Sequence, residues 1–319
     1  MKYDLIIIGS GAAGLSAALY ARRYKMETLV IQGEFGGETA TAGIIENYPG
    51  IFSIDGFELM QSMQKQAKDI GAMFEKGKAE KITTDGNCFT VKVGDKELEG
   101  NTVILAIGSE RRHLNLPNEK ELTGKGVHYC VTCDGPVYSG KTVAMIGGGD
   151  SSVKGVNFLA EYAEKIYLIV RGKEVLAEPV NLERMKKLGD KVEVLLETEI
   201  EKIVGEKFLD KLILSKEYQG SKDLKVDGMF VEVGFDPDKT FAEQLGIKLD
   251  EKGYMKVDNL MHTNVPGVFA AGDATNHFGR FKQDITASAL GAVAATSAYE
   301  YHQTHGDFCE LHGKVSNTN

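Results

Sequence analysis

The sequence contains no long hydrophobic run. No stretch of its 319 residues approaches the roughly 18 consecutive apolar residues that a membrane-spanning helix needs. The apolar start, MKYDLIIIGS, is too short to provide both the core and the cleavage site of a secretory signal peptide. We therefore expect a cytoplasmic protein that has no membrane span and no membrane partner.

Positive charge is also in short supply. Lys and Arg number 37 and Asp and Glu number 46, so the formal charge is 37 − 46 = −9. A protein that binds nucleic acid without specificity needs a broad basic face, and this balance argues against one. Two local basic clusters, at 22–25 and 111–113, are most simply interpreted as solvated surface. We expect no nucleic-acid partner.

Cysteine is rare as well, with four in the whole chain. In a reducing compartment, a structural disulfide framework is not expected. Cys88 and Cys309 stand alone in the sequence, and each is interpreted as an ordinary thiol. Only Cys130 and Cys133, in the segment CVTCDG, form a motif.

A C-x-x-C pair can bind zinc, form a structural disulfide or act as a redox dithiol. Zinc needs four ligands, usually from a second cysteine pair or a histidine pair. The sequence offers neither near this motif, so we predict no metal site. A redox dithiol is favoured, because two intervening residues close a ring small enough to form and break without moving the fold. A nearby helix N-terminus would stabilise a thiolate there.

Two segments share the pattern strand, glycine turn, helix, strand. The first spans 4–33 and contains GSGAAG at 9–14, and the second spans 141–170 and contains GGGDSS at 147–152. Glycines at this spacing let the backbone approach a pyrophosphate at a helix N-terminus. The sequence therefore predicts an α/β fold with two dinucleotide-binding, Rossmann-like domains.

The two predicted domains are not consecutive in the chain. Proline and charge runs at 114–124 and 233–244 are typical of junctions between domains. We predict that 1–115 and 246–319 form one discontinuous domain, and that 118–244 form a second domain inserted into it.

Taken together, the motifs form a recognisable set. The chain resembles the low-molecular-weight thioredoxin reductases, a branch of the flavoprotein disulfide reductases, from about residue 3 to residue 302. The motifs that carry the resemblance are GSGAAG (9–14), GGETATAGIIENYPG (36–50), CVTCDG (130–135), GGGDSS (147–152) and GVFAAGDA (267–274). The resemblance implies a homodimeric enzyme that reduces thioredoxin. Its discontinuous domain would bind FAD, and its inserted, NAD(P)H-binding-like domain would carry the redox cysteines.

The resemblance also assigns the residues that hold FAD. They are small or polar residues of the discontinuous domain, namely Gly9, Gly11, Ala13, Gly14, Gly36, Gly37, Glu38, Asn47, Gly272, Asp273, Gln283 and Ile285. Two positions depart from the family pattern. Glu38 stands where the family usually has Gln, and Gln32 ends the second strand, where an acid is typical and Glu34 is the nearest one. We expect rearranged contacts to the adenosine ribose.

For the cysteine pair, the resemblance implies distinct roles. Cys133 is the thiol that faces the flavin, and Cys130 is the thiol that attacks the disulfide of thioredoxin. Asp134 matches the acid that moves a proton to the thiolate. A helix N-cap is an alternative and compatible role for Asp134, because Asp is a favoured capping residue.

The electron donor is the open question of the sequence. The family recognises NADPH with the motif H-R-R-x-x-x-R, whereas this chain has VRGKEVL at 170–176 and keeps only Arg171. NAD would need an acid at the same strand end, and none stands at 170–172. NADPH is therefore doubtful, and the resemblance to a subgroup that lacks the motif favours reduced ferredoxin. Arg280 and Lys282 are candidates for its docking face.

Two alternatives stay open at this point. The protein is interpretable as an NADPH- or NADH-dependent thioredoxin reductase, or a related disulfide reductase. It is also interpretable as a flavin-bound redox module that no longer turns over, although the intact C-x-x-C and Asp134 argue against that.

Overall fold

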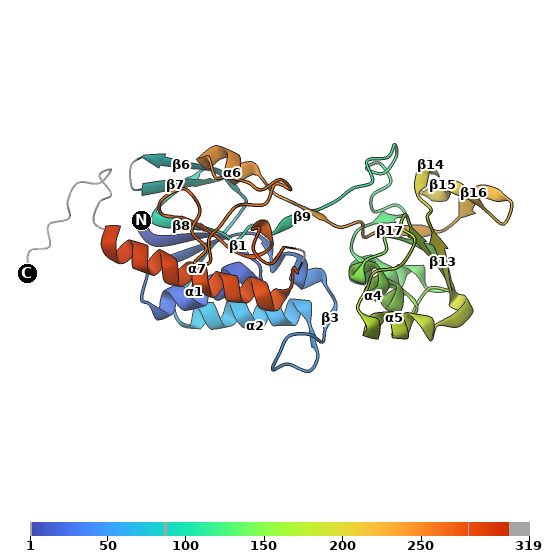
Figure 1. The fold of residues 1–319 in the computed structure, drawn as a ribbon, viewed down its shortest axis with the longest axis horizontal. Helices are drawn as coiled ribbons and strands as arrows, with labels where there is room; N and C mark the ends of the chain where they lie inside the picture. Colours follow the sequence, from blue (N-terminus) through green and yellow to red (C-terminus); the bar gives the residue numbers. More distant parts are fainter. Residues whose placement is uncertain (1, 86–87, 280, 306–319) are drawn as a thin grey trace, which may run out of the picture. The chain divides into compact units, whose positions relative to one another are not determined.

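The computed structural model describes residues 2–85, 88–279 and 281–305 (Figure 1). The chain divides into two compact units, which are described separately. Unit 1 consists of Met1–Glu110 together with Pro237–Asn319, and unit 2 consists of Arg111–Asp236.

Unit 1 is built on a mixed β-sheet. Its strand order is β5-β2-β1-β8-β7-β6, with β19 pairing to β8. The strands are β1 (Lys2–Ser10), β2 (Thr28–Phe35), β5 (Met73–Lys76), β6 (Ala79–Asp85), β7 (Cys88–Val93), β8 (Lys96–Leu105) and β19 (Val268–Ala270). Pairs among β5, β2, β1, β8 and β19 are parallel, whereas β6, β7 and β8 pair antiparallel.

Helices cover this sheet because both of its faces are apolar. Helices α1 (Ala12–Arg23) and α7 (Asp284–His305) run side by side on one face (Figure 1), where small residues such as Ala17 and Ala294 are fully buried. The other helices of unit 1 are α2 (Gly56–Asp69) and α6 (Thr240–Leu245). Short elements complete it: η1 (Gly37–Thr41), β3 (Ile44–Ile45), β4 (Ile54–Asp55) and η4 (Gly272–Ala274).

Unit 2 contains a parallel sheet in the order β10-β17-β11-β12-β13 and an antiparallel sheet in the order β14-β15-β16. The parallel strands are β10 (Val127–His128), β11 (Thr142–Ile146), β12 (Lys165–Val170), β13 (Val192–Leu196) and β17 (Gly228–Val231). The antiparallel strands are β14 (Ile200–Gly205), β15 (Leu209–Tyr218) and β16 (Ser221–Lys225). The helical elements are α3 (Val131–Asp134), η2 (Gly135–Tyr138), α4 (Asp150–Leu159), α5 (Pro179–Lys186) and η3 (Gly189–Lys191).

Both predicted strand–turn–helix–strand segments are present. Strands β1 and β2 pair in parallel around α1, and β11 and β12 pair in parallel around α4. The predicted α/β class with two Rossmann-like parallel arrangements is confirmed. No helix in the described part of the chain has the combined length and apolar character needed to cross a bilayer.

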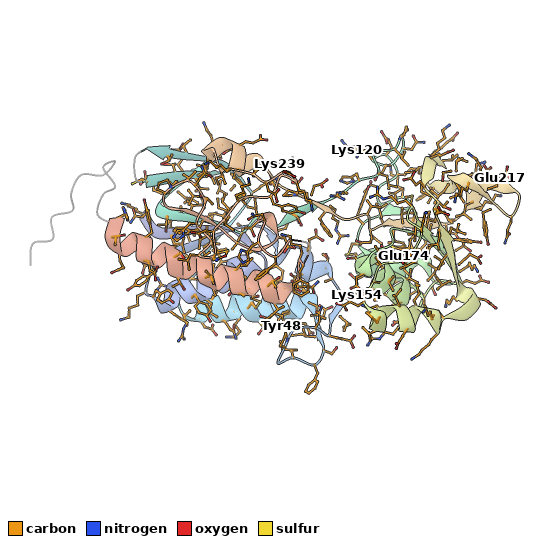
Figure 2. All side chains as sticks on the ribbon, viewed as in Figure 1. Tyr48, Lys120, Lys154, Glu174, Glu217 and Lys239 are labelled. Carbon is orange, nitrogen blue, oxygen red and sulfur yellow. A yellow bond between two sulfur atoms is a disulfide. The ribbon has the colours of Figure 1, made fainter. Side chains whose placement is uncertain are left out.

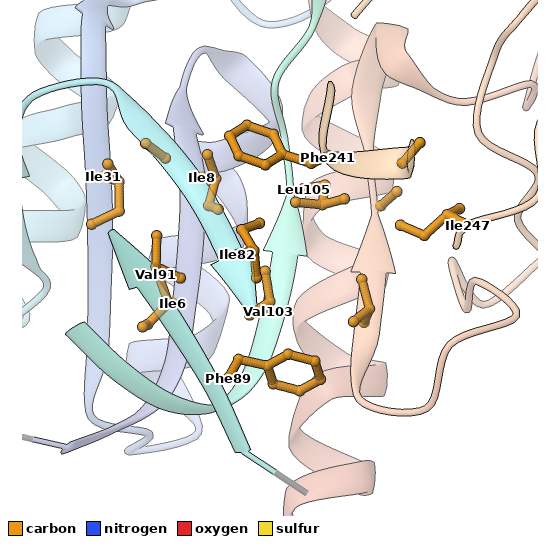
Figure 3. Packing of buried hydrophobic residues seen from close by; sticks show 14 of the residues in the cluster. Ile6, Ile8, Ile31, Ile82, Phe89, Val91, Val103, Leu105, Phe241 and Ile247 are labelled. Carbon is orange, nitrogen blue, oxygen red and sulfur yellow. The ribbon is translucent and has the colours of Figure 1, made fainter. Parts of the chain in front are cut away.

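The chain passes between the units through β9 (Ser109–Arg111) and β18 (Phe235–Pro237), which pair with each other. The division of the structure differs from the predicted junctions by a few residues at each passage. Residues 237–245 belong to unit 1, because Phe241 and Ala242 of α6 are buried in its core with Ile82 and Phe89 (Figure 3). A short helix with two buried apolar residues therefore lies within the charged run that we interpreted as a junction.

At the other passage, the segment after Arg111 belongs to unit 2. The buried carboxylate of Glu119 accepts hydrogen bonds from the backbone amides of Leu114 and Leu116 and from the hydroxyl of Tyr129. This one side chain folds a proline-containing segment onto unit 2, and the sequence pattern does not reveal it.

The packing of α7 on α1 gives a first prediction. A Cβ atom added at Gly291 would lie 2.0 Å from the carbonyl oxygen of Ala13. Gly291→Ala should therefore destabilise the protein, by about 1–3 kcal/mol for overpacking, although alanine is favoured over glycine in a helix by about 1 kcal/mol. Thermal unfolding followed by circular dichroism measures the effect.

The exposed Ala289 of the same helix provides the control. Ala289→Gly isolates the helix-propensity contribution, and we expect a loss of about 1 kcal/mol. A Gly291→Ala protein at least as stable as the wild type would contradict the close packing.

Candidate active site

The turn between β1 and α1 is shaped by backbone contacts that only glycine allows. Gly9 has a φ of 109°, and a Cβ there would lie 2.1 Å from the carbonyl oxygen of Ala106. A Cβ at Gly14 would lie 2.0 Å from the carbonyl oxygen of Gly9. At Gly11 the nearest atom would be 3.7 Å away. Packing within the protein therefore explains Gly9 and Gly14 but leaves Gly11 free for another purpose.

That purpose fits a bound pyrophosphate. Gly11 is the N-cap of α1, and no side chain caps this helix end. The first backbone amides of a helix have no partner within the helix, so they are available to an anion. Ala13 belongs to this first turn, and its backbone is also the part of α1 against which Gly291 packs. The residues present fit a dinucleotide cofactor at this turn.

Two chain segments that are distant in sequence meet near this turn, where a Cβ at Gly37 would lie 3.8 Å from the Cα of Gly11. Gly36 has a φ of 69°, Gly37 has a φ of 57°, and Gly37 begins η1. Thr39 of η1 donates a hydrogen bond to Asp284, the first residue of α7. Asn47 donates through Nδ2 to Oε1 of Gln283 at 2.9 Å. The structure thus brings the predicted residues at 36–47 together with those at the start of α7, including Ile285.

A second group of predicted residues lies in η4. Gly272 has a φ of 77°, and a Cβ there would lie 2.9 Å from the Cβ of Ala13, so η4 lies close to α1. Burial raises the pKa of Asp273 to about 6. The ammonium of Lys282 opposes this rise, and the carboxylates of Asp284 and Glu38 add to it. Three carboxyl groups and one ammonium therefore interact electrostatically where the flavin residues are predicted.

Lys282 is held within this group. Burial lowers the pKa of Lys282, and its Nζ donates to the carbonyl oxygen of Thr275 at 2.6 Å. The same Nζ lies 4.6 Å from the centre of the Tyr254 ring. Lys282 is half-buried and held by these contacts, and its part in docking a donor stays a prediction. Arg280, the other candidate, lies outside the described residues.

The family pattern places an acid near the end of β2, and the residues to consider there are Gln32 and Glu34. Gln32 accepts a hydrogen bond from Nε2 of Gln64 at 2.9 Å, and Glu34 is exposed. Strand β2 continues to Phe35, so Gln32 lies within the strand and not at its end, where dinucleotide-binding proteins typically place a carboxylate for the ribose. The rearrangement of the ribose contacts stays a prediction.

The predicted redox cysteines lie in unit 2 and form a disulfide. The sulfur atoms of Cys130 and Cys133 are 2.08 Å apart, with 5.3 Å between the Cα atoms. Cys130 is the N-cap of α3, and its Sγ accepts a hydrogen bond from the backbone amide of Cys133 at 3.2 Å. Cys130 is half-buried and Cys133 is exposed. The helix terminus expected beside the motif is therefore present, and Cys130 is the sulfur that it would stabilise as a thiolate.

Asp134 follows the pair as the last residue of α3 and the N-cap of η2. Its side chain makes no capping hydrogen bond, so the structure does not support the capping role. Instead, Oδ2 of Asp134 lies 3.0 Å from Nδ1 of His128. His128 is buried in β10, and sequence reasoning missed it. The only available signal was a histidine two positions before Cys130.

The second glycine turn repeats the backbone packing of the first. Gly147 has a φ of 133°, and a Cβ there would lie 2.1 Å from the carbonyl oxygen of Glu232. Ser152 donates a hydrogen bond to the same oxygen at 3.1 Å. Packing therefore explains both of these motif positions without a ligand.

The segment after β12 closes back onto this turn. The backbone amide of Leu176 donates to the carbonyl oxygen of Gly148 at 2.7 Å. In the segment between β12 and Leu176, the side chains of Arg171 and Lys173 are exposed. Glu174, which is labelled in Figure 2, is exposed as well. At the start of α4, Oδ1 of Asp150 accepts hydrogen bonds from the Glu178 amide and the Asn181 side chain. This site thus offers two cations, without the further arginines of the NADPH motif.

Two remaining predictions concern metals and the other cysteines. Within the described residues, no three His, Cys, Asp or Glu side chains are grouped in a way that could hold a metal ion. Cys88 is buried in β7 and is disulfide-bonded, so the expectation of an ordinary thiol is wrong for it. Cys309 lies outside the described residues.

Known proteins resemble this chain along nearly its whole length. A relative from Listeria innocua named thioredoxin reductase is 37% identical over 302 residues, which cover 94% of this chain and 93% of that protein. The crystal structure of a thioredoxin reductase from Lactococcus lactis matches with a TM-score of 0.89 and 33% identity, covering 95% of this chain and 99% of that one.

A third protein bears on the donor. The crystal structure of a ferredoxin-flavin thioredoxin reductase from Clostridium acetobutylicum matches with a TM-score of 0.51 and 33% identity, covering 95% of this chain and 99% of that one. The sequence profile of the pyridine nucleotide-disulphide oxidoreductases matches residues 3–295. With the glycine turn and the disulfide already described, these matches show that the chain belongs to the pyridine nucleotide-disulphide oxidoreductase family, in its low-molecular-weight thioredoxin reductase branch.

Proposed function

We propose that this protein is an FAD-dependent thioredoxin-disulfide reductase that works in the cytoplasm as a homodimer. The observation that carries the proposal is the Cys130–Cys133 disulfide at the start of α3, followed directly by a carboxylate. Relatives named thioredoxin reductase support thioredoxin as the substrate. FAD would be held by the glycine turn at 9–14, by η1, by Asp273 and by the start of α7, and once a donor has reduced it, it would supply a pair of electrons.

The residues of the chain then carry out thiol–disulfide chemistry. The Cys130–Cys133 disulfide accepts two electrons and one proton, its S–S bond breaks, and one thiol and one thiolate form. The thiolate of Cys130 attacks the disulfide of thioredoxin, forms a mixed disulfide and releases one thioredoxin sulfur as a thiolate. Attack by Cys133 on the mixed disulfide restores the Cys130–Cys133 bond and releases reduced thioredoxin. Asp134 is assigned the proton transfers at these sulfur atoms.

We propose reduced ferredoxin as the electron donor. The strand end that reads the 2′-phosphate of NADPH in the family keeps only Arg171 of the motif, and has Gly172 and Leu176 where the family has arginines. Lys173 is a further cation in this segment. A one-electron protein donor needs no such pocket. The similarity to a protein named ferredoxin-flavin thioredoxin reductase supports the same choice.

NADPH or NADH is the second candidate donor, and a specific observation favours it. The β11–α4–β12 frame keeps a glycine turn in which a Cβ at Gly149 would meet nothing within 4 Å, so space for a ligand is present. The choice between the donors therefore depends on the charges at the strand end rather than on the shape of the turn.

Single cysteine variants test the disulfide assignment. Cys133→Ser should abolish reduction of thioredoxin, because the disulfide that accepts electrons can no longer form. Cys130→Ser should leave the Cys133 thiolate beside oxidised FAD, and an absorption band at longer wavelength than the flavin bands would report their contact. Both variants should remain yellow and bind one FAD per chain. Thioredoxin reduction by both variants at the wild-type rate would refute the assignment.

Asp134→Asn tests the proton role. We expect the exchange of electrons between dithiol and flavin to slow by about 10²–10⁴-fold, the usual range for general acid–base catalysis, with FAD retained. Rapid-mixing absorbance of the flavin measures this rate. Asp223→Asn, which removes a carboxylate paired with Lys211 elsewhere in unit 2, is the matched control and should leave the rate unchanged. An unchanged rate in Asp134→Asn would remove Asp134 from the mechanism.

The donor prediction follows from the two missing arginines. Each charge-assisted hydrogen bond to a phosphate contributes roughly 1.5–3 kcal/mol, so NADPH should bind about 10²–10⁴-fold more weakly than in a protein that has both. We expect reduced ferredoxin to support thioredoxin reduction and NADPH at cellular concentrations to give little or none. Rapid reduction of the flavin by micromolar NADPH would overturn the ferredoxin proposal.

A pair of charge variants sharpens this comparison. Gly172 and Leu176 are exposed, and a Cβ at Gly172 would lie no closer than 3.6 Å to other atoms, so both positions accept long side chains. Gly172→Arg with Leu176→Arg should tighten binding of NADP⁺ in calorimetry, by about tenfold or more for each restored contact. Gly172→Glu with Leu176→Glu is the control of opposite charge. Equal affinity in the two double variants would show that this strand end does not read the phosphate.

A further inference from the structure

We propose that His128 holds the exchangeable proton of the redox site and passes it to the dithiol through Asp134. The inference rests on the proposed dithiol chemistry of Cys130 and Cys133, and it adds a residue to it. The polar contacts of His128 are with Asp134 and Tyr138 and not with the sulfur atoms, so it acts as a positioning and proton-holding residue for Asp134.

The contacts of His128 define both of its ring nitrogens. Nδ1 lies 3.0 Å from Oδ2 of Asp134, and Nε2 lies 2.6 Å from the hydroxyl oxygen of Tyr138. The imidazole ring stacks on Phe230 of β17, with 5.3 Å between ring centres and an interplanar angle of 28°. Only 6% of His128 is exposed, whereas the side chain of Asp134 is 40% exposed. The imidazole is therefore fixed inside unit 2, and the carboxylate reaches from it to solvent.

Tyr138 determines where the neutral imidazole carries its proton. Burial raises the pKa of Tyr138 to about 12, and the charges of Asp134 and Asp227 add to the effect. At neutral pH the phenol therefore keeps its own proton, and its oxygen can accept a hydrogen bond from Nε2. The imidazolium donates from Nδ1 to Asp134 and from Nε2 to Tyr138, and a neutral imidazole that has passed its Nδ1 proton to Asp134 keeps its proton on Nε2. Gain and loss of a proton at Nδ1 then need no rotation of the ring.

Within the described residues, few charged groups surround His128, and the His128 variant leaves each of them unchanged. Asp134 comes from α3 and Tyr138 from η2. Asp227, which precedes β17, is held by the backbone amide of Thr142 at 2.9 Å. Lys141 places its Nζ 5.7 Å from the centre of the Tyr138 ring. The face of β17 toward the imidazole is the apolar ring of Phe230.

The chemistry of the dithiol gives this arrangement a task. When the disulfide accepts two electrons, one of the two thiolates takes up a proton. A carboxylate in water is ionised at neutral pH and has no proton to give, whereas imidazole exchanges protons near neutrality. The Nδ1–H bond of the imidazolium breaks as an O–H bond forms on Asp134, and that O–H bond breaks as the S–H bond forms. Asp134 ends unchanged, His128 becomes neutral, and the reverse sequence returns the proton when the thiol becomes a nucleophile.

His128→Gln is the decisive variant, because glutamine keeps a hydrogen-bond donor for Asp134 but cannot exchange a proton near neutrality. The dithiol of the FAD-loaded full-length protein is reduced with dithiothreitol, freed of excess reagent and mixed with the small disulfide 5,5′-dithiobis(2-nitrobenzoate). Rapid-mixing absorbance of the released thiolate gives the rate at each pH. This reaction needs neither an electron donor nor thioredoxin.

We expect the wild-type rate to show one ionisation between about pH 6 and pH 8, in the range of imidazole. That step should disappear in His128→Gln, with a rate about tenfold or more lower near neutrality, below the full range of general acid–base catalysis. The matched control is His262→Gln, which removes another histidine–aspartate pair with a 3.0 Å contact, in unit 1. Its pH profile should equal that of the wild type.

A second measurement stands if His128→Gln does not fold. In ¹⁵N-histidine NMR spectra of the wild type, His128 should carry its proton on Nε2 when neutral, and its signal should change with the midpoint of the rate profile. Asp134→Asn should move that midpoint. A folded His128→Gln protein that keeps the ionisation, or a His128 signal indifferent to Asp134→Asn, would overturn this inference and leave the reductase proposal intact. A wild-type dithiol that does not react with the disulfide reagent at all would instead overturn the proposed function.

Discussion

One backbone contact is shared by both halves of the molecule, and the sites depend on it. At the start of each glycine turn, a glycine with positive φ lies against the carbonyl oxygen that follows a neighbouring strand. A Cβ would approach that oxygen to 2.1 Å in both cases, at Gly9 against Ala106 and at Gly147 against Glu232. Such distances exclude every side chain. Packing within the protein therefore fixes the turn, the strand end and the following helix relative to one another, without a contribution from a ligand.

The later glycines of the two turns differ in a way that separates packing from binding. In unit 1, Gly14 lies against the carbonyl of Gly9, whereas in unit 2 Ser152 takes this position and donates a hydrogen bond to Glu232. The middle glycines, Gly11 and Gly149, are free of close contacts in both turns. A glycine motif alone therefore does not distinguish a binding turn from an inherited one. The side chains after the second strand determine which dinucleotide can bind. The donor proposal therefore rests on the segment after β12.

How far the sequence predicts this site depends on how local the determining contacts are. Both glycine turns and the cysteine pair are compact in sequence, and the structure has the parallel strand pairs and the disulfide that they predict. Contacts between distant segments, such as Asn47 with Gln283, followed only from the family resemblance. The link from His128 to Asp134 was missed because no periodicity marks a strand residue that turns toward a helix end. The helix α6 was missed as part of unit 1 because its apolar residues stand in a charged segment.

Charge is organised differently at the two sites, and their chemistry explains the difference. At the predicted flavin site, Asp273 is half-buried and shares its surroundings with Glu38, Asp284 and Lys282, and its pKa rises to about 6, chiefly because its carboxylate is desolvated. Such a group suits a fixed contact to a cofactor, because burial holds it in place and limits its exchange with solvent. At the cysteine pair, Asp134 stands partly in solvent and its histidine partner is buried. A carboxylate that reaches water and an imidazole that does not are suited to moving a proton between the interior and a sulfur atom, which thiol–disulfide exchange requires at every turnover and a bound cofactor does not.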